Sequence, residues 1–388
     1  MRVISFGIYS LRPEYPRHRN LLSALEANGI EVVECHYSMT ASFKERLESA
    51  GTLLGRVKYG LRLLGSYFSL AVKFLKAPPA DAVLVGYPGY FHVRFVRLLQ
   101  VVKNRKAVLV YDIFFSLYNA VVSDRKLLDQ DSIAARLIHA IERDACRAAD
   151  ICLIDTAAHL DYIAAEFNIS REKIRRVFVG PTFAVSDIER TQNNAGESFR
   201  VLFVGTYIPL HGIGTILEAA ERLKHDQGIL FTLVGTGQLR EEIEGQARDA
   251  GLSNVKFVDW IDHRDMPDTL QSCDLALGVF GTTEKASRVI PIKVFDICAA
   301  GVPFITADTP AIKEVFTHGE DAFFIPAGDA DALAEAIVLL KGNQELRERI
   351  AKGGHELACT TFSVEEIGRE LVRTIDSQMK RHADTDTR

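Results

Sequence analysis

Short apolar runs alternate with longer amphipathic stretches along most of the chain. The runs are rich in β-branched residues, and the segments between them are long enough for helices. Because each parallel strand needs a crossover before the next, this rhythm predicts parallel sheets covered by helices on both faces, an α/β doubly wound architecture. The predicted strands are 3–6, 82–86, 107–111, 151–155, 176–179, 200–205, 230–235, 255–260, 275–279 and 302–306.

A polar stretch, SDIERTQNNAGES, interrupts this rhythm and has no apolar period, which is typical of a linker. We therefore predict a Rossmann-like domain at 1–185, a linker at 186–198 and a second Rossmann-like domain at 199–362. A C-terminal helix at 363–380 can pack back on the first domain. The last residues, 381–388, have a composition that predicts a loose tail.

The segment 41–76 departs from the α/β pattern because it is helix-like throughout. After Glu48 it carries five cations and no acid beside apolar residues at helical spacing. Basic residues that flank an apolar stripe favour contact with an anionic membrane surface. The alternative is an ordinary pair of helices that packs its apolar stripe into the core.

Composition and charge narrow the class of protein. The chain has 388 residues, 47% hydrophobic and 25% charged, which is the balance of a folded soluble protein with room for two domains. Its net charge of −5 divides into +7 up to Gly180 and −12 beyond, so the first half favours an anionic partner. The six cysteines form no CxxC pair, and the start lacks a signal-peptide pattern, which together predict a cytoplasmic protein without a zinc site.

The densest chemical information begins at Arg200, where RVLFVGTYIPLHGIGTILEAAERL predicts a strand, a loop and a helix. The free N–H groups at such a junction, and the positive end of the helix, form a seat for phosphate. Gly205 and Gly212 let the backbone approach a ligand closely. Glycine in this kind of loop also has purely steric uses, so the pattern alone is a weak signal.

Two further strand ends are predicted to converge on the same crevice, because ligands of open parallel sheets lie beyond the carboxyl ends of the strands. FTLVGTGQ ends near Gly235, and VKFVDWID ends near Trp260 and Ile261, where a nucleotide base is expected. The alternative for Trp260 is simple packing in the core.

A cluster of charge follows within residues 278–316. Arg288 and Lys293 stand on either side of an expected helix start at Pro291 and are suited to a diphosphate, while Asp296, one turn on, is suited to ribose hydroxyls. The alternative is an internal ion pair between Asp296 and one of the two cations.

Taken together, the motifs VLFVGTYIPLHGI, FTLVGTGQ, ICAAGVPFI and HGEDAFFIPAGDADALAEAI resemble the donor domain of the family 4 retaining glycosyltransferases. The first half, through PEYPRHRNLLSALEANGIEV and YDIFFSLYN, is similar to a branch of that family. This resemblance implies the GT-B fold, with two Rossmann-like domains facing across a cleft. It also implies sugar transfer with retention from a UDP- or GDP-sugar co-substrate to a glycan or lipid-linked acceptor, in polysaccharide or glycolipid synthesis.

The donor-site residues of the family are only partly matched. Thr206 and His211 stand where the family has an arginine and a lysine on the donor phosphates, so charge would come from Arg288, Lys293 and a protonated His211. The second of the two family glutamates falls on Asp296, whereas the first falls on Arg288. Glu284 is the nearest upstream acid and is taken as the candidate for the donor sugar.

In the first half the resemblance implies further site residues. The loop that contains Gly7, Tyr9 and Ser10 is similar to the glycine loop that faces the diphosphate, with Arg17 just beyond it. Asp112 falls where many members have a histidine near the sugar, and is the candidate for acceptor alignment or proton transfer. Its alternative is a cap of the following segment. The remaining candidates for the same cleft are Ser116 and Arg125.

No aspartate pair with metal-ligand spacing follows a predicted strand, which favours a reaction without a metal and without a tightly bound cofactor. Two alternatives stay open. One is a nucleotide-sugar epimerase or hydrolase of the same fold. The other is a non-catalytic subunit that binds nucleotide sugar, which the replacements at Thr206, His211 and Arg288 would suit. Nucleic-acid binding is not indicated, because the basic residues form no recognisable nucleic-acid module.

Overall fold

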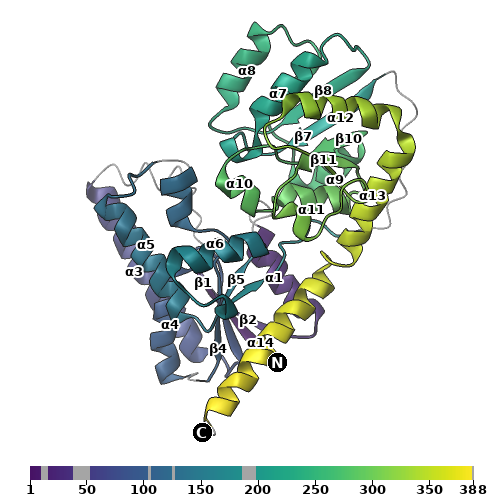
Figure 1. The fold of residues 1–388 in the computed structure, drawn as a ribbon. Helices are drawn as coiled ribbons and strands as arrows, with labels where there is room; N and C mark the ends of the chain where they lie inside the picture. Colours follow the sequence, from purple (N-terminus) through teal and green to yellow (C-terminus); the bar gives the residue numbers. More distant parts are fainter. Residues whose placement is uncertain (10–15, 38–52, 104–105, 125–126, 186–197, 387–388) are drawn as a thin grey trace. The chain divides into compact units, whose positions relative to one another are not determined.

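The computed structural model describes residues 1–9, 16–37, 53–103, 106–124, 127–185 and 198–386 (Figure 1). It contains two compact units, each with its own sheet. The first comprises residues 1–155, 160–177 and 367–388, and the second comprises 156–159 and 178–366. The predicted pair of α/β domains is therefore confirmed. The main part of the second unit begins at Phe178, before the expected linker, because this residue packs on the second unit: its ring lies 6.3 Å from that of Phe295 and 5.2 Å from that of Phe362.

All six strands of the first unit run parallel in the order β2-β1-β3-β4-β5-β6. The direction of winding reverses between β1 and β3, so the carboxyl ends of these two strands mark a switch point, the usual place for a ligand in such sheets. Strands β3, β4 and β5 are buried on both faces and consist mainly of valine, leucine and isoleucine. The strands are β1 (Arg2–Gly7), β2 (Glu31–His36), β3 (Ala82–Val85), β4 (Val108–Asp112), β5 (Ile151–Ile154) and β6 (Ile174–Arg176).

Helices cover both faces of this sheet. Helix α5 starts where the Ser132 side chain accepts a hydrogen bond from Ala135 N, 3.1 Å away, which satisfies one of the free donors of its first turn. The helices of the first unit are α1 (Pro16–Ala27), α3 (Leu53–Lys76), α4 (Tyr90–Val102), η1 (Asn119–Asp124), α5 (Ile133–Ala148), α6 (Ala157–Phe167, whose first three residues group with the second unit), η2 (Arg171–Lys173) and most of α14 (Val364–Asp386).

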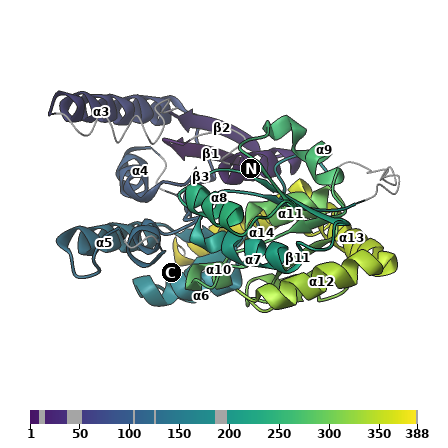
Figure 2. The same cartoon turned by 90° about the horizontal axis from the view of Figure 1, so that it is seen from above.

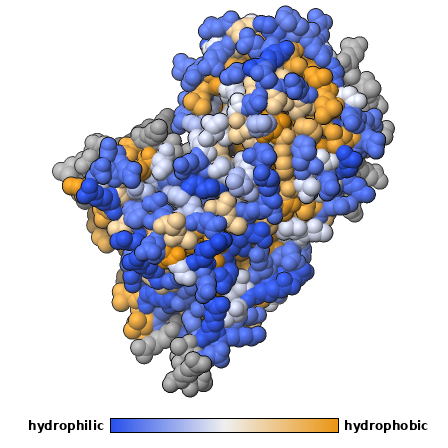
Figure 3. Space-filling view, in the orientation of Figure 1, coloured by the Kyte–Doolittle hydropathy of each residue, from blue (hydrophilic) through white to orange (hydrophobic). Residues whose placement is uncertain are grey.

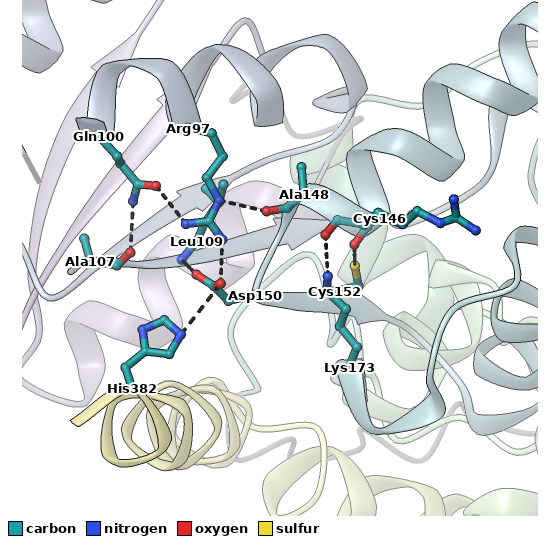
Figure 4. Close-up of polar contacts among 11 residues, drawn as sticks. Arg97, Gln100, Ala107, Leu109, Cys146, Ala148, Asp150, Cys152, Lys173 and His382 are labelled. Carbon is teal, nitrogen blue, oxygen red and sulfur yellow. Dashed lines mark hydrogen bonds and ion pairs between the residues drawn. The ribbon is translucent and has the colours of Figure 1, made fainter. Parts of the chain in front are cut away.

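Helix α14 returns from the second unit to the first, as the predicted C-terminal helix can. Near its end, His382 Nε2 lies 3.7 Å from Asp150, a carboxylate that also accepts from Leu109 N and Arg97 (Figure 4). The expectation of a loose tail from residue 381 is wrong up to Asp386, because this contact carries the helix onward. Residues 387–388 lie outside the described residues.

The second unit has a parallel sheet of order β12-β11-β10-β7-β8-β9, with its switch point between β7 and β10. Its strands are β7 (Phe199–Val204), β8 (Ile229–Val234), β9 (Val255–Val258), β10 (Leu275–Leu277), β11 (Phe304–Ala307) and β12 (Phe323–Ile325). Its helices are η3 (Pro209–His211), α7 (Ile213–Arg222), α8 (Arg240–Asp249), η4 (His263–Asp265), α9 (Met266–Gln271), α10 (Glu284–Arg288), α11 (Ile292–Ala299), η5 (Ile312–Glu314), α12 (Ala330–Gly342) and α13 (Gln344–Cys359).

The segment singled out for its basic, apolar composition is partly described. Residues 41–52 lie outside the described residues, and the remainder forms α3, which Figure 2 shows beside α4. One face of α3 buries Leu70 and Phe74 in the core, while Leu61, Leu64 and Phe68 are each at least 65% exposed. Among the described helices, none is long and apolar enough to cross a membrane.

Candidate functional site

Two loops meet at the switch point of the second unit. Gly205 directly follows β7, and the segment after β10 returns to it, where Phe280 N donates to His211 O over 3.1 Å. Gly212 has a φ of +65°, and a Cβ there would lie 2.5 Å from the carbonyl carbon of Phe280. This position accepts only glycine for both reasons, so the loop pair needs the glycine that the sequence supplies.

Lys293 comes from the first turn of α11 and points into this loop pair. Its Nζ lies 3.7 Å from the centroid of the Phe203 ring, and a Cβ on Gly205 would collide with it. Among the described residues Nζ has no hydrogen-bond partner, and it is shielded from solvent. Burial lowers the pKa of Lys293 well below its usual value. An ammonium in this position is costly unless an anion compensates it, so the residues present fit an anionic ligand.

His211 lies in the same loop pair and is buried. Its Nδ1 is 2.5 Å from Thr206 O, so it donates to that carbonyl. Burial, and then the Lys293 charge, lower the pKa of His211 well below its usual value. The expectation that a protonated His211 supplies charge is therefore not supported: with Nδ1–H bound to a carbonyl, the neutral ring offers the lone pair of Nε2.

Arg288 and Glu284 lie at opposite ends of the one-turn helix α10, which Thr283 caps by accepting from Ala286 N. Arg288 Nη2 donates to Glu284 Oε2 over 2.9 Å, and Nε donates to Glu284 O. The Arg288 side chain is mostly buried, whereas that of Glu284 is 89% exposed. Glu284, the candidate acid for the donor sugar, is thus an exposed carboxylate that is paired with the mostly buried guanidinium of Arg288.

Asp296 is buried one turn beyond Lys293 on α11. Its Oδ1 accepts from Thr182 N at 2.7 Å and from Thr182 Oγ1 at 2.9 Å. The alternative of an ion pair with Lys293 is ruled out within the described residues, because Lys293 Nζ has no partner there. Asp296 therefore fixes the segment that follows the first unit, and whether it also binds ribose remains a prediction.

The nucleotide base is expected at the ends of β8 and β9. Gly235 follows β8, where Arg240 Nη1 donates to its carbonyl over 2.6 Å and Nη2 donates to Asp259 Oδ1. Trp260 is 65% exposed, so its interpretation as a core residue is wrong. The strand ends at Val258, and the chain leaves the core before Trp260. Ile261 is partly buried beside it.

In the first unit Asp112 closes β4 and is completely buried. Arg17, from α1, donates to it from Nε and Nη2 at 3.1 and 2.9 Å and donates from Nη1 to Val177 O. Burial raises the pKa of Asp112, and the Arg17 charge opposes that shift. This geometry gives both residues an internal role in the unit; proton transfer by Asp112 remains a prediction.

The other candidates of the first unit divide between the strand ends and the core. Tyr9 follows Gly7 at the switch point, and its hydroxyl lies 2.6 Å from Ser5 Oγ, which in turn is 2.8 Å from His18 Nε2. Ser116 donates to Glu142 Oε2 over 2.7 Å. Ser10 and Arg125 lie outside the described residues.

Three contacts at these sites were not predicted. Thr182 precedes the linker, and only the fold brings it to Asp296, so no local pattern reveals it. Arg240 directly follows the glycine loop of β8, and a cation at that place was a usable signal. Phe203 is an ordinary strand residue whose contact with Lys293 depends on the return of α11.

Comparison with known proteins finds similarity mainly in the second half of the chain. Residues 185–357 match the family model described as glycosyl transferases group 1. The chain is 29% identical over 179 residues to the lipopolysaccharide core biosynthesis glycosyltransferase LpsE of Rhizobium meliloti, covering 46% of this chain and 50% of that one. It is 28% identical over 180 residues to the phosphatidyl-myo-inositol mannosyltransferase of Mycobacterium leprae, covering 46% of each. The chain spans about half the length of these curated relatives.

The structural likeness extends over the whole chain. HepE of Anabaena, solved in complex with UDP, superposes with a TM-score of 0.70 at 15% identity and covers 97% of this chain and 100% of its own. At this identity the likeness shows the fold alone, and that fold is GT-B, as the sequence motifs imply.

Proposed function

We propose that the chain is a glycosyl transferase of group 1, the family whose model matches residues 185–357, and that it transfers a sugar from a nucleotide-sugar donor to an acceptor, with retention and without a metal. The relatives named above act in lipopolysaccharide core synthesis and in the mannosylation of a phospholipid, which supports a glycan or lipid-linked acceptor. We place the reaction on the cytoplasmic side of the membrane as part of the same proposal.

The observation that carries this proposal is the shielded side-chain nitrogen of Lys293 beside the glycine loop of β7. A donor diphosphate at this place would favour the charged form of that nitrogen, and the resulting cation would neutralise the diphosphate as it departs. Arg288 is the second cation for that role, with Gly205, Thr206 and Gly212 as the backbone seat.

We assign the rest of the donor by position. Asp296 holds the ribose, and the base lies against the exposed edge near Gly235, Trp260 and Ile261. Glu284 serves the donor sugar, for which its pair with the mostly buried Arg288 must open. Donor binding must compensate the cost of opening this pair.

The test is turnover of a panel of UDP- and GDP-sugars, with methyl glycosides and polyprenyl diphosphate-linked sugars as acceptors. Transfer to one of these, lost in Lys293→Met, supports the proposal. Release of free sugar or an epimer without acceptor would identify the hydrolase or epimerase instead. Binding of a nucleotide without any turnover would identify a non-catalytic binding subunit.

We also propose that the first unit rests on an anionic membrane surface through α3 and α4. Beyond its core face, α3 exposes Leu61, Leu64 and Phe68, and α4 exposes Phe91, Leu98, Val101 and Val102. Core packing alone explains only the buried face of α3. Exposed cations accompany these side chains, namely Arg62, Lys76 and Lys106. Each cation near an anionic surface contributes ~1 kcal/mol.

Vesicle co-sedimentation tests this attachment. The protein should bind phosphatidylserine-containing vesicles, less at high salt, and Leu64→Glu with Phe68→Glu should abolish binding. The matched control is Val338→Glu with Leu339→Glu, a pair of apolar residues on α12 of the second unit that are 48% and 49% exposed. Equal binding by both variants would contradict the proposed surface.

A further inference from the structure

The segment that follows β4 has an unusual backbone. Phe115 N donates to Ile113 O over 2.7 Å, which closes a three-residue turn with Phe114 at its centre. Phe114 has a φ of +56°, a left-handed conformation that glycine adopts freely and a bulky residue adopts only at a cost. Backbone strain of this kind concentrates at ligand sites, where the surrounding structure maintains it.

Three aromatic rings gather at this turn. The Phe115 ring lies 4.3 Å from that of Tyr87, the Phe114 ring lies 5.9 Å from Tyr87, and the two phenylalanines are 5.6 Å apart. Tyr87 belongs to the loop after β3, the parallel neighbour of β4, so both loops lie at the carboxyl edge of the same sheet. All three residues are only partly buried, which leaves part of the aromatic cluster open to solvent.

The turn is held firmly on both sides. Before it, Asp112 is fixed by Arg17. After it, the buried carboxylate of Glu142 on α5 accepts from Ser116 Oγ, Leu117 N and Tyr118 N, at 2.7, 2.6 and 3.0 Å. The strained turn is therefore pre-organised by buried polar groups on neighbouring elements, as binding sites require.

We propose that Tyr87, Phe114 and Phe115 form a platform on which a pyranose ring of the acceptor stacks. The face of a pyranose that carries several C–H bonds is apolar and matches an aromatic surface, while its hydroxyls stay in water. The carboxyl edge near the switch point of the first sheet is the place where ligands of such sheets bind. This inference rests on the proposed function, which it deepens by naming the acceptor chemistry and the residues that select it.

The test is saturation-transfer difference NMR on the full chain with UDP present, using methyl α- and β-pyranosides of glucose, galactose and mannose. We expect saturation of the ring C–H protons of at least one pyranoside. Phe114→Gly should abolish it, whereas Phe114→Tyr should retain it. Phe115→Leu is the second variant and should weaken it at least fivefold.

Melting temperature separates this role from packing. Glycine relieves the left-handed strain, so Phe114→Gly should melt at or above the wild-type temperature if the ring serves a ligand. A lower melting temperature would make Phe114 a packing residue and overturn the proposal. Unchanged saturation in Phe114→Gly, or absence of saturation by every pyranoside in a protein that binds UDP, would also overturn it. If the wild-type protein did not bind UDP, that result would instead contradict the proposed function.

Octyl β-glucopyranoside distinguishes a sugar from a lipid tail. Saturation transferred to its ring protons, at the level of the methyl glycoside, supports the platform. Saturation confined to the alkyl chain, and lost in Phe114→Gly, would show that the aromatic cluster binds lipid and that the proposal is wrong.

Discussion

The two units differ in whether the buried ionisable groups near their strand ends are paired. In the first unit, Arg17 donates to Asp112 at the end of β4, and Glu142 accepts hydrogen bonds from three donors in the loop that follows. In the second unit, Lys293 Nζ is also shielded and contacts the Phe203 ring, but it has no hydrogen-bond partner among the described residues. Of these groups, only Lys293 departs from the rule that buried charged groups are paired.

The difference separates structural charge from functional charge. A buried ion pair within one unit stabilises the fold, and breaking it lowers the free energy of unfolding whether or not a ligand is bound. A buried cationic group without a hydrogen-bond partner lowers the free energy of unfolding in the free protein, and it becomes favourable only when an anion binds beside it. Substitutions of the paired charge in the first unit and of Lys293 in the second should therefore have opposite effects on stability.

The largest effect is expected for Arg17→Met, which leaves the Asp112 carboxylate buried without its guanidinium. Breaking a buried pair in this way costs ~3–5 kcal/mol in the free energy of unfolding. Urea unfolding measures it. The double variant Arg17→Met with Asp112→Leu should recover much of the loss, because no buried charge remains. A single variant as stable as the wild type would mean that Asp112 is not held by this pair.

Lys293→Met should change stability in the opposite direction from Arg17→Met. The substitution removes a desolvated ionisable group and keeps the packing on Phe203, so the free energy of unfolding should be equal to or above that of the wild type. Turnover should fall ~100–1000-fold if the ammonium stabilises the departing diphosphate, the loss typical for one such donor. The control is Lys341→Met, which removes a pair with Asp226 on the far side of the unit. A large loss of stability with unchanged turnover would assign Lys293 to the fold.

Asp296 combines the two behaviours, since it holds Thr182 and is assigned to the ribose. Asp296→Asn keeps an oxygen for Thr182 but loses the charge, so UDP affinity should fall ~10–100-fold, the range for one hydrogen bond to a charged group. Calorimetry with UDP measures this. Thr182→Val is the control, which should lower stability and leave affinity within about threefold. Equal affinities in Asp296→Asn and the wild type would end the ribose assignment.

Most of the fold could be predicted from the sequence because parallel strands buried on both faces produce continuous apolar runs. The strands β2 and β12 were not predicted. The first is an edge strand, EVVECH, with two glutamates among its apolar residues, and the second is only three residues long. Edge and short strands are stabilised by pairing with a neighbour, which local composition does not reveal.

The candidate site was predicted unevenly for a similar reason. Residues at strand ends, such as Gly205 and Gly212, were found because backbone geometry restricts the residue type at those positions. The partners of charged groups could not be predicted, because Arg17 lies 95 positions from Asp112 in the sequence and Thr182 lies 114 positions from Asp296. Whether a charge is satisfied depends on such long-range contacts, and that decides between a structural and a functional role.

The smallest expected effect is the pH dependence of stability and of UDP affinity, and it tests whether Lys293 differs from the paired charges of the first unit. Its pKa in the folded chain is lowered by burial, so the unfolded chain holds more protons between the folded and the unfolded pKa values. The stability contributed by this group must therefore rise with pH through that window, with a slope of at most ~1.4 kcal/mol per pH unit. A diphosphate beside Nζ favours the charged form, so UDP affinity should fall with rising pH, by at most about tenfold per unit. His211 keeps its pKa well below the usual value, so it stays neutral throughout and adds no slope.

Calorimetry from pH 7 upward, in two buffers of different ionisation enthalpy, measures the proton taken up with UDP. That uptake should vanish in Lys293→Met, and a wild-type affinity that is flat across the range would show that the diphosphate lies elsewhere.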